Sequence, residues 1–262
     1  MPTHPGTSRR DAASPDSAVA TRLEALRARI AAAEAAAGRS PGSVTLVAVG
    51  KTFDADALRA AAVAGARVFG ENYLQEALAK QEALAALDLE WHFIGAVQSR
   101  KARALADHFD WVQTVDREKI ARRLAEARAA GARMADRGPL QICIQVNLDA
   151  EASKAGVTPD GARSLVDAAR GMPGLRVRGL MAIPAPRTER AAQQAAFERL
   201  AALAAEIRAG LPSAEAEDFD VLSMGMSADL EAAIAAGATH VRIGSALFGP
   251  RRARPPEKDA AP

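Results

Sequence analysis

The feature that most constrains the fold is an eightfold alternation of short β-rich runs with longer, alanine-rich amphipathic runs. This pattern predicts βαβ units around a parallel sheet. The expected strands are residues 44–49, 67–69, 91–94, 111–115, 141–146, 177–182, 221–223 and 240–243. The expected helices are residues 55–64, 74–87, 99–108, 119–130, 160–170, 190–208 and 228–236. Eight repeats in a chain of 262 residues predict an α/β fold, a single (β/α)8 TIM barrel.

An open, doubly wound sheet is the alternative architecture. Its nucleotide-binding members carry a glycine-rich turn after the first strand. Here the chain reads Val49-Gly50-Lys51-Thr52-Phe53 at that point, which favours the closed barrel.

One large domain is expected, at residues 18–250, with an extra helix at about 18–37 in front of the first strand. Residues 1–17 and 251–262 mix proline with charged residues and lack periodicity. We expect both segments to be disordered tails.

Composition excludes several classes of function. The 34 basic and 32 acidic residues leave a formal net charge of +2, so we expect no nucleic-acid partner. Cys143 is the single cysteine and the four histidines lack metal-ligand spacing, so neither a disulfide nor a metal site is expected. Without a long apolar run or a signal-like N-terminus, we expect a soluble, cytoplasmic protein that does not contact a membrane.

Polar residues gather where the expected strands end. Active sites of parallel barrels lie at the carboxyl ends of the strands, so these residues predict a ligand pocket at one mouth of the barrel. They are Lys51, Glu71, Asn72, Tyr73, His92, Asp116, Arg117, Asn147, Met181, Ser223, Met226, Ser227, Arg242, Gly244 and Ser245.

Lys51 follows the largely apolar first strand. A lysine beside a low-dielectric pocket favours the neutral, nucleophilic amine that attacks an aldehyde. The alternative is a lysine solvated at the end of a strand.

The loops after strands seven and eight predict a phosphate site. Gly225, Ser227, Gly244 and Ser245 lie there, where barrels bind phosphate with backbone N–H groups and hydroxyls. Ser227 is equally interpreted as the N-cap of a helix that begins at residue 228.

Two charged or titratable residues lie inside expected strands. Arg242 alternates with Val241 and Ile243, so it is expected to point into the barrel, where it needs a hydrogen-bond acceptor; the alternative is a surface arginine. His92 fits a pocket residue and a hydrogen-bonded core residue equally well.

Seven segments together resemble the YggS/PROSC group of pyridoxal phosphate homeostasis proteins over residues 20–250. They are LVAVGKT (46–52), FGENYLQEA (69–77), WHFIGAVQSRKAR (91–103), VDR (115–117), QVNLDAEASKAGV (145–157), GLMAIP (179–184) and LSMGMSADLEAAIAAGATHVRIGSALFG (222–249). The resemblance implies a barrel like the N-terminal domain of alanine racemase. It also implies pyridoxal 5'-phosphate (PLP) as the cofactor, held as a Schiff base on Lys51.

The resemblance also assigns roles to other residues. The phosphate-cradling segments correspond to Ser223, Met226, Ser227, Gly244 and Ser245. Arg242 corresponds to the arginine facing the pyridine nitrogen, and Asn72, His92 and Met181 are taken as pocket residues. Lys154 corresponds to a second family lysine, a possible second cofactor position.

The sequence departs from the family in two places near Lys51. Gly50 stands where a serine is common, and Phe53 where a second lysine is common, so a lysine relay is not expected. Ser245 replaces a common threonine and keeps the hydroxyl.

The expected function is a PLP carrier rather than an enzyme. An arginine at the pyridine nitrogen weakens the ring as an electron sink. Racemases with that arginine use a second general base, which in alanine racemase is a tyrosine from a separate β-rich domain. The sequence stops soon after strand eight, and Tyr73, the only tyrosine, lies in the barrel's own second loop, so we do not expect it to replace that base. We expect a monomer or weak dimer that passes PLP to apo-enzymes. A PLP-dependent amino-acid racemase is the runner-up, and a phosphosugar-type barrel is a third interpretation.

Overall fold

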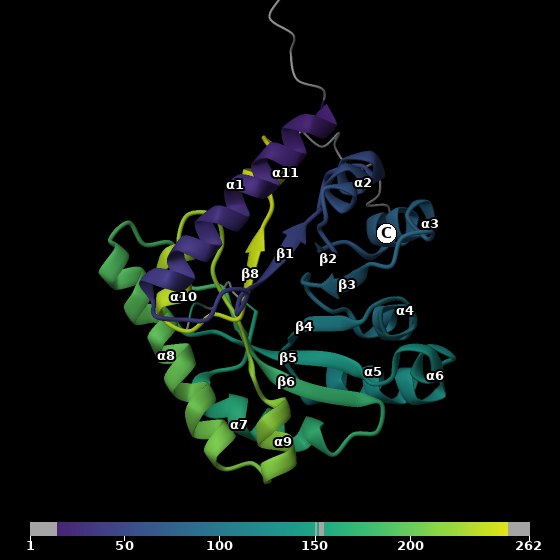
Figure 1. Cartoon of the computed structure of the whole chain (residues 1–262). Coiled ribbons are helices and arrows are strands. Elements are labelled where there is room, and N and C mark those ends of the chain that lie inside the picture. The colour runs from purple at the N-terminus through teal and green to yellow at the C-terminus, as the bar shows by residue number, and fades with distance from the viewer. Residues whose placement is uncertain (1–14, 150, 152–154, 251–262) are drawn as a thin grey trace, which may run out of the picture.

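Eight parallel strands pair in sequence order and close into a barrel (Figure 1). The computed structural model describes residues 15–149, 151 and 155–250. Closure occurs where β1 pairs with β8, with Leu46 opposite Val241. The strands are β1 Thr45–Val49, β2 Val68–Glu71, β3 Glu90–Phe93, β4 Trp111–Val115, β5 Leu140–Val146, β6 Leu175–Ala182, β7 Val221–Ser223 and β8 His240–Ile243. The closed (β/α)8 barrel is confirmed, and the open sheet is wrong.

Helices surround the strands. They are α1 Pro15–Ala36, α2 Ala55–Val63, α3 Leu74–Ala83, the 3-10 helix η1 Ser99–Lys101, α4 Ala102–His108, α5 Glu118–Ala130, α6 Arg133–Arg137, α7 Pro159–Arg170, α8 Arg190–Ala209, α9 Ser213–Asp218, α10 Leu230–Ala235 and α11 Ser245–Phe248. The sequence pattern did not predict α6, α9 and α11, because four to six residues are too few to show a helical period.

The bounds of several helices differ from the expectation, and α3 ends at Ala83 rather than at residue 87. The extra N-terminal helix α1 begins at Pro15 rather than at residue 18, with Asp16 in its first turn, where a carboxylate is favourable. Helix α10 begins at Leu230 rather than at 228, with Asp229 as its N-cap. Residues 15–17 of the expected N-terminal tail (1–17) belong to helix α1, and the rest of that tail and the expected tail at 251–262 lie outside the described residues.

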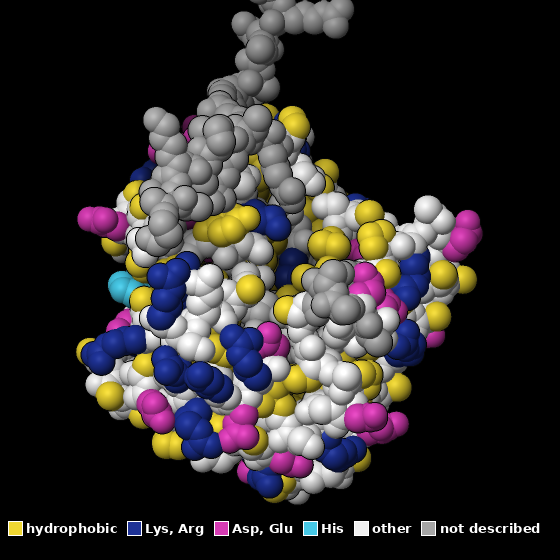
Figure 2. Space-filling model, turned by 180° about the vertical axis from the view of Figure 1, so that it is seen from behind, with side chains coloured by type: hydrophobic (Ala, Val, Ile, Leu, Met, Phe, Trp, Pro, Cys, Tyr) yellow, Lys and Arg dark blue, Asp and Glu magenta, His cyan; other side chains and the backbone are white. Residues whose placement is uncertain are grey.

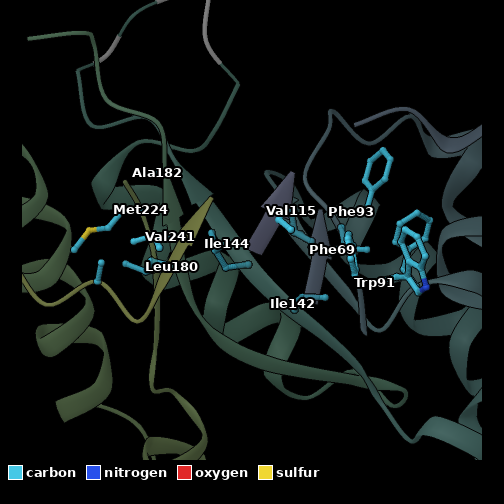
Figure 3. Close-up of a cluster of buried hydrophobic side chains, with 14 of the residues drawn as sticks. Phe69, Trp91, Phe93, Val115, Ile142, Ile144, Leu180, Ala182, Met224 and Val241 are labelled. Atoms are coloured by element: carbon cyan, nitrogen blue, oxygen red, sulfur yellow. The ribbon is translucent and has the colours of Figure 1, made fainter. Parts of the chain in front are cut away.

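The main hydrophobic core lies between the barrel and its helices. It takes alternate side chains of every strand, and Figure 3 shows members from the strands around the barrel. Aromatic rings fill one side of it: Phe69 and Trp91 lie 5.7 Å apart, and Phe93 and Phe109 lie 5.4 Å apart edge to face. Alanines on the inner faces of the helices allow close approach to the strands.

The inside of the barrel is unusually polar. Barrel interiors are usually filled by branched apolar side chains, and here an apolar cluster of Trp111, Cys143, Met181 and Val221 occupies only part of the space. The remaining buried interior side chains include His92, Gln113, Ser223 and Arg242.

Helix α1 joins the first and last repeats. It packs against α2, α10 and α11, and in Figure 1 it lies alongside β1 and β8. Arg29 pairs with Glu231 through two hydrogen bonds of 2.5 and 2.7 Å. Arg39 donates to the carbonyls of Ile234 and Ala238 at 3.1 and 2.7 Å.

Among the described residues, no helix is both long and apolar enough to cross a bilayer. The face in Figure 2 carries Lys and Arg side chains close together on one side, with Asp and Glu side chains among and around them.

Candidate functional site

Lys51 lies in a tight turn directly after β1. The turn closes with a hydrogen bond of 3.0 Å from the Phe53 amide to the Gly50 carbonyl, and the Gly50 amide donates to the Gly70 carbonyl at 2.9 Å. Thr52 has φ of 70°, the one positive φ of a non-glycine residue among those described. A β-branched side chain is strained in that conformation. The half-buried Lys51 side chain is therefore carried by a strained, anchored turn at the carboxyl end of its strand.

A buried ion pair supports this turn from below. Lys80 of α3 donates from Nζ to Glu71 Oε1 and to the Gly50 carbonyl, both at 2.8 Å. The side chains of Lys80 and Glu71 are 5% and 0% exposed. Burial raises the pKa of Glu71 to about 7, although the charge of Lys80 opposes the increase.

The position of the Glu71 side chain in the Lys80–Glu71 pair requires a glycine at residue 50. A Cβ at Gly50 would lie 2.6 Å from Glu71 Oε1, closer than real Cβ atoms approach. The other carboxylate oxygen, Oε2, is buried without a hydrogen-bond partner among the described residues. A serine at this position would thus need Glu71 to move.

The loops after β7 and β8 come together at the same end of the barrel. The Arg242 amide donates to the Gly225 carbonyl at 3.0 Å, which ties the β7 loop to β8. A Cβ at Gly244 would lie 3.2 Å from the Val49 carbonyl oxygen, so the β8 loop passes close to the end of β1. The β8 loop therefore lies beside the strand that leads to Lys51, and the β7 loop lies beside β8.

The β7 loop does not have the predicted cap. Ser227 opens a turn rather than capping a helix at residue 228, so the N-cap interpretation is wrong. Asp229 holds this loop instead, because its Oδ1 accepts from the Met226 amide at 2.6 Å. On the β8 side, Ser245 is the first residue of α11 and Gly244 its N-cap.

Arg242 points into the barrel, as the alternation of β8 predicted. Its Nη1 donates to Ser223 Oγ at 2.7 Å and its Nη2 to the Ala182 carbonyl at 2.9 Å. Burial lowers the pKa of Arg242 to about 10, so the guanidinium remains charged at neutral pH. These two bonds use two of its five N–H groups.

His92 is a hydrogen-bonded interior residue. The ring is fully buried, stacks on Trp111 at 5.0 Å, and bonds to Glu90 at 2.7 Å and Gln113 at 2.6 Å. Trp111 begins β4 and Glu90 begins β3. The ring thus faces the amino-terminal half of the barrel, away from the strand ends where the resemblance had placed it.

Asn72 and Met181 differ in their surroundings. Asn72 Nδ2 lies 3.5 Å from the Ile94 carbonyl, while its Oδ1 is buried with no hydrogen-bond partner in the described chain. Met181 is fully buried in the interior apolar cluster, so its side chain acts as packing beneath the mouth. Lys154 lies outside the described residues.

Exposed apolar side chains mark the mouth. Tyr73, Ile183 and Met226 are 44%, 37% and 41% exposed. They follow β2, β6 and β7, so they belong to the same end of the barrel as Lys51. The described residues hold no cluster of three or more His, Cys, Asp or Glu side chains placed to bind a metal ion.

Sequence reasoning missed the residues that support this site. Lys80 looks like any helical lysine, and Glu90 like a residue of the loop before β3. Gln113 left one signal, because it is a polar residue in the middle of the largely apolar strand WVQTV.

A PLP-sized aldehyde fits the residues present at this mouth. Its phosphate would meet the amides and hydroxyls of the β7 and β8 loops, and its phenolic O–H would meet the unpartnered Asn72 Oδ1. Its ring nitrogen is an acceptor for an arginine that can only donate.

Comparisons with known proteins agree with this geometry. The model of the alanine racemase N-terminal domain family matches residues 21–252. The pyridoxal phosphate homeostasis protein of Pseudomonas aeruginosa is 55% identical over 90% of this chain and 96% of its own length. The pyridoxal phosphate homeostasis protein of Escherichia coli K12 is 46% identical over 89% of this chain and 97% of its own length.

Solved structures point to the same group. PipY of Synechococcus elongatus with PLP bound matches with a TM-score of 0.73 and 38% identity, over 88% of this chain and all of the other. Alanine racemase of Corynebacterium glutamicum, at 18% identity and a TM-score of 0.63, shares the fold over 88% of this chain and 60% of its own. The chain belongs to the family of pyridoxal phosphate homeostasis proteins, within the larger family of alanine racemase N-terminal domains.

Proposed function

We propose that this protein binds PLP at the carboxyl end of the barrel, with Lys51 holding it as a Schiff base, and passes it to apo-enzymes. When bound, the cofactor supplies an aldehyde that a neutral lysine amine can attack. The observation that carries the proposal is the convergence of Lys51, the Gly225–Ser227 and Gly244–Ser245 loops, and a buried, charged Arg242 at one mouth.

Each group has a defined task. The Gly50 carbonyl, held by Lys80 and Phe53, fixes the turn from which the Lys51 amine extends. Arg242 donates to the ring nitrogen and keeps it unprotonated, which disfavours carbanion chemistry. We therefore propose a carrier without fast turnover, in the cytoplasm, as a monomer or weak dimer that does not contact nucleic acid. Lys154 remains a proposed second position.

Adduct mapping tests the site. The full chain is mixed with PLP, reduced with borohydride, digested and analysed by mass spectrometry. The expected result is the phosphopyridoxyl mass on the Lys51 peptide, lost in Lys51→Ala and retained in Lys119→Met, an exposed lysine on α5. Label on Lys154 alone would move the site, and a chain that takes up no cofactor would refute the proposal.

Two further assays separate carrier from racemase. Loaded protein is mixed with a PLP-dependent apo-enzyme, whose regained activity reports transfer. Loaded protein alone is incubated with L-alanine, and formation of the D-enantiomer is followed by chiral chromatography. Rapid racemisation that requires Lys51 would establish the enzyme and refute the carrier.

A further inference from the structure

A continuous chain of hydrogen bonds crosses the inside of the barrel. Arg242 Nη1 lies 2.7 Å from Ser223 Oγ, which lies 2.7 Å from Gln113 Oε1. Gln113 Nε2 lies 2.6 Å from His92 Nδ1, and His92 Nε2 lies 2.7 Å from Glu90 Oε1. Residues from β8, β7, β4 and β3 thus connect the buried arginine to a carboxylate at the start of β3.

The chemistry of arginine sets the direction of every bond in this chain. A guanidinium only donates, so Ser223 Oγ accepts from it and directs its own proton to Gln113 Oε1. The amide Nε2 of Gln113 then donates to His92 Nδ1, which therefore carries no proton. The proton of the neutral ring lies on Nε2, where it is donated to the Glu90 carboxylate.

The opposite orientation would leave two groups unpaired. If the Gln113 amide were reversed, Ser223 Oγ would face two donors and its proton would lack this acceptor. His92 Nδ1 would need a proton, and a neutral ring would then turn a bare Nε2 toward a carboxylate. Buried polar groups without partners are strongly unfavourable, so the observed orientation is the one in which every member is satisfied.

The far end of the chain carries a carboxylate, in addition to Asp229 on the β7 loop, whose charge raises the pKa of Arg242 against the effect of burial. Arg242 bonds to a hydroxyl and a carbonyl, both neutral. Glu90 is 44% exposed at its side chain. Burial acts to raise the pKa of Glu90, but the hydrogen bond from His92 and the charges of Arg178 and Arg137 oppose it, and the net pKa is lowered. The carboxylate is thus ionised at neutral pH, and hydrogen bonds aligned in a low dielectric strengthen one another.

We propose that Glu90, His92, Gln113 and Ser223 are positioning residues, a relay that orients the Arg242 guanidinium and transmits the charge of Glu90 to it. The relay sets how strongly Arg242 binds the ring nitrogen of PLP. This inference rests on the proposed function. It makes cofactor affinity depend on a carboxylate at the opposite end of the barrel.

The first test needs no cofactor. Nitrogen NMR of the full chain, free of PLP and labelled at histidine, reports which ring nitrogen of His92 carries the proton. The relay requires a protonated Nε2 and a bare Nδ1. Gln113→Leu removes the donor to Nδ1, so the preference of the His92 proton for Nε2 is expected to be lost. A proton on Nδ1 in the wild-type protein would overturn the relay.

The second test measures PLP affinity by absorbance titration. Glu90→Gln keeps an acceptor for His92 Nε2 but removes the charge, and it is expected to weaken binding about three- to tenfold. The spectrum of the bound cofactor should also change, with the melting temperature near that of the wild type. Asp88→Asn is the matched control, because Asp88 lies near Glu90 in the chain, is 91% exposed, and pairs with Arg137 outside the relay.

The outcomes separate the two proposals. Equal affinity and equal spectra for Glu90→Gln and Asp88→Asn would overturn the relay while PLP binding stood. A wild-type chain that takes up no PLP would overturn the proposed function and the role of the relay in affinity. The NMR measurement of the His92 tautomer would still test the directions of the hydrogen bonds in the relay, because it needs no cofactor.

Discussion

Removing Lys80 should strongly destabilise the protein. Lys80→Met would leave the fully buried Glu71 carboxylate without its cation, and breaking a buried pair in this way costs about 3–5 kcal/mol. For a domain of this size, a loss of about 4 kcal/mol lowers Tm by about 8–16 °C. The matched control is Lys119→Met, which removes an exposed lysine and should change stability by less than about 0.5 kcal/mol.

The effect of Lys80→Met should depend on pH. The folded pKa of Glu71, already raised by burial to about 7 from 4.5, rises further when the cation is removed. A carboxyl whose folded pKa exceeds its unfolded pKa binds more protons when folded, so stability falls as pH rises through that window. The variant should therefore lose less stability at pH 5 than at pH 8.

A double variant completes the cycle. The double variant Lys80→Met with Glu71→Leu removes both charges of the buried pair. The Gly50 carbonyl still accepts a hydrogen bond from the Phe53 amide. Stability should return to within about 1 kcal/mol of the wild type. The measurement is urea unfolding followed by circular dichroism at both pH values. A single variant that loses less than about 1 kcal/mol at pH 8, or a double variant no better than the single, would refute this account of the pair.

Three further outcomes follow from the geometry. Thr52→Gly should raise the free energy of unfolding by about 1 kcal/mol by relieving the φ of 70°. Thr52→Ala removes the hydroxyl and the γ-methyl but keeps the Cβ, so equal effects of the two substitutions in urea unfolding would argue against backbone strain. Gly179→Ala should lower the free energy of unfolding by more than about 4 kcal/mol or prevent folding, because its Cβ would lie 1.9 Å from the Val221 carbonyl oxygen. Gly171→Ala is the control, because there is open space around that residue. Similar melting temperatures for the two variants would contradict the prediction. Burial lowers the pKa of His240 to about 3 from 6.5, so the contribution of the neutral ring to the free energy of unfolding is present above pH 6.5 and falls by about 2 kcal/mol between pH 7 and 5. His240→Phe should flatten the dependence of stability on pH in that range. An unchanged slope would exclude His240 as the origin of that dependence.

The sequence predicted the barrel well because its period is long and regular. Eight repeats of a strand and an amphipathic helix left little freedom in topology, and the inward orientation of Arg242 followed from its apolar neighbours in β8. The short helices were missed, because a single turn has no period to detect. The cap of α10 was misplaced, since Ser227 and Asp229 are both good caps and only the loop geometry chooses between them.

The support of the site was much harder to read from sequence. The Gln113–His92 contact joins residues of different repeats, the Lys80–Glu71 pair joins a strand to the helix that follows it, and no local pattern records either contact. His92 was placed at the mouth because its strand ends there, but the direction of its ring depends on Gln113 and Glu90. Residues held by partners distant in sequence are found only when the fold brings those partners together.

Helix α1 has a consequence for the order of folding. It leaves the ribosome before the barrel strands, yet its Arg29 and the nearby Arg39 bind Glu231 and the carbonyls around α10, and Glu231 follows Arg29 by 202 residues. Contacts of such long sequence separation form slowly. The part of α1 that packs against α10 and α11 must therefore remain uncovered through most of synthesis, when nascent chains are most prone to aggregate. The barrel therefore closes between β1 and β8 only after the last repeat has been made. A chain cut before α10 would keep this part of α1 uncovered.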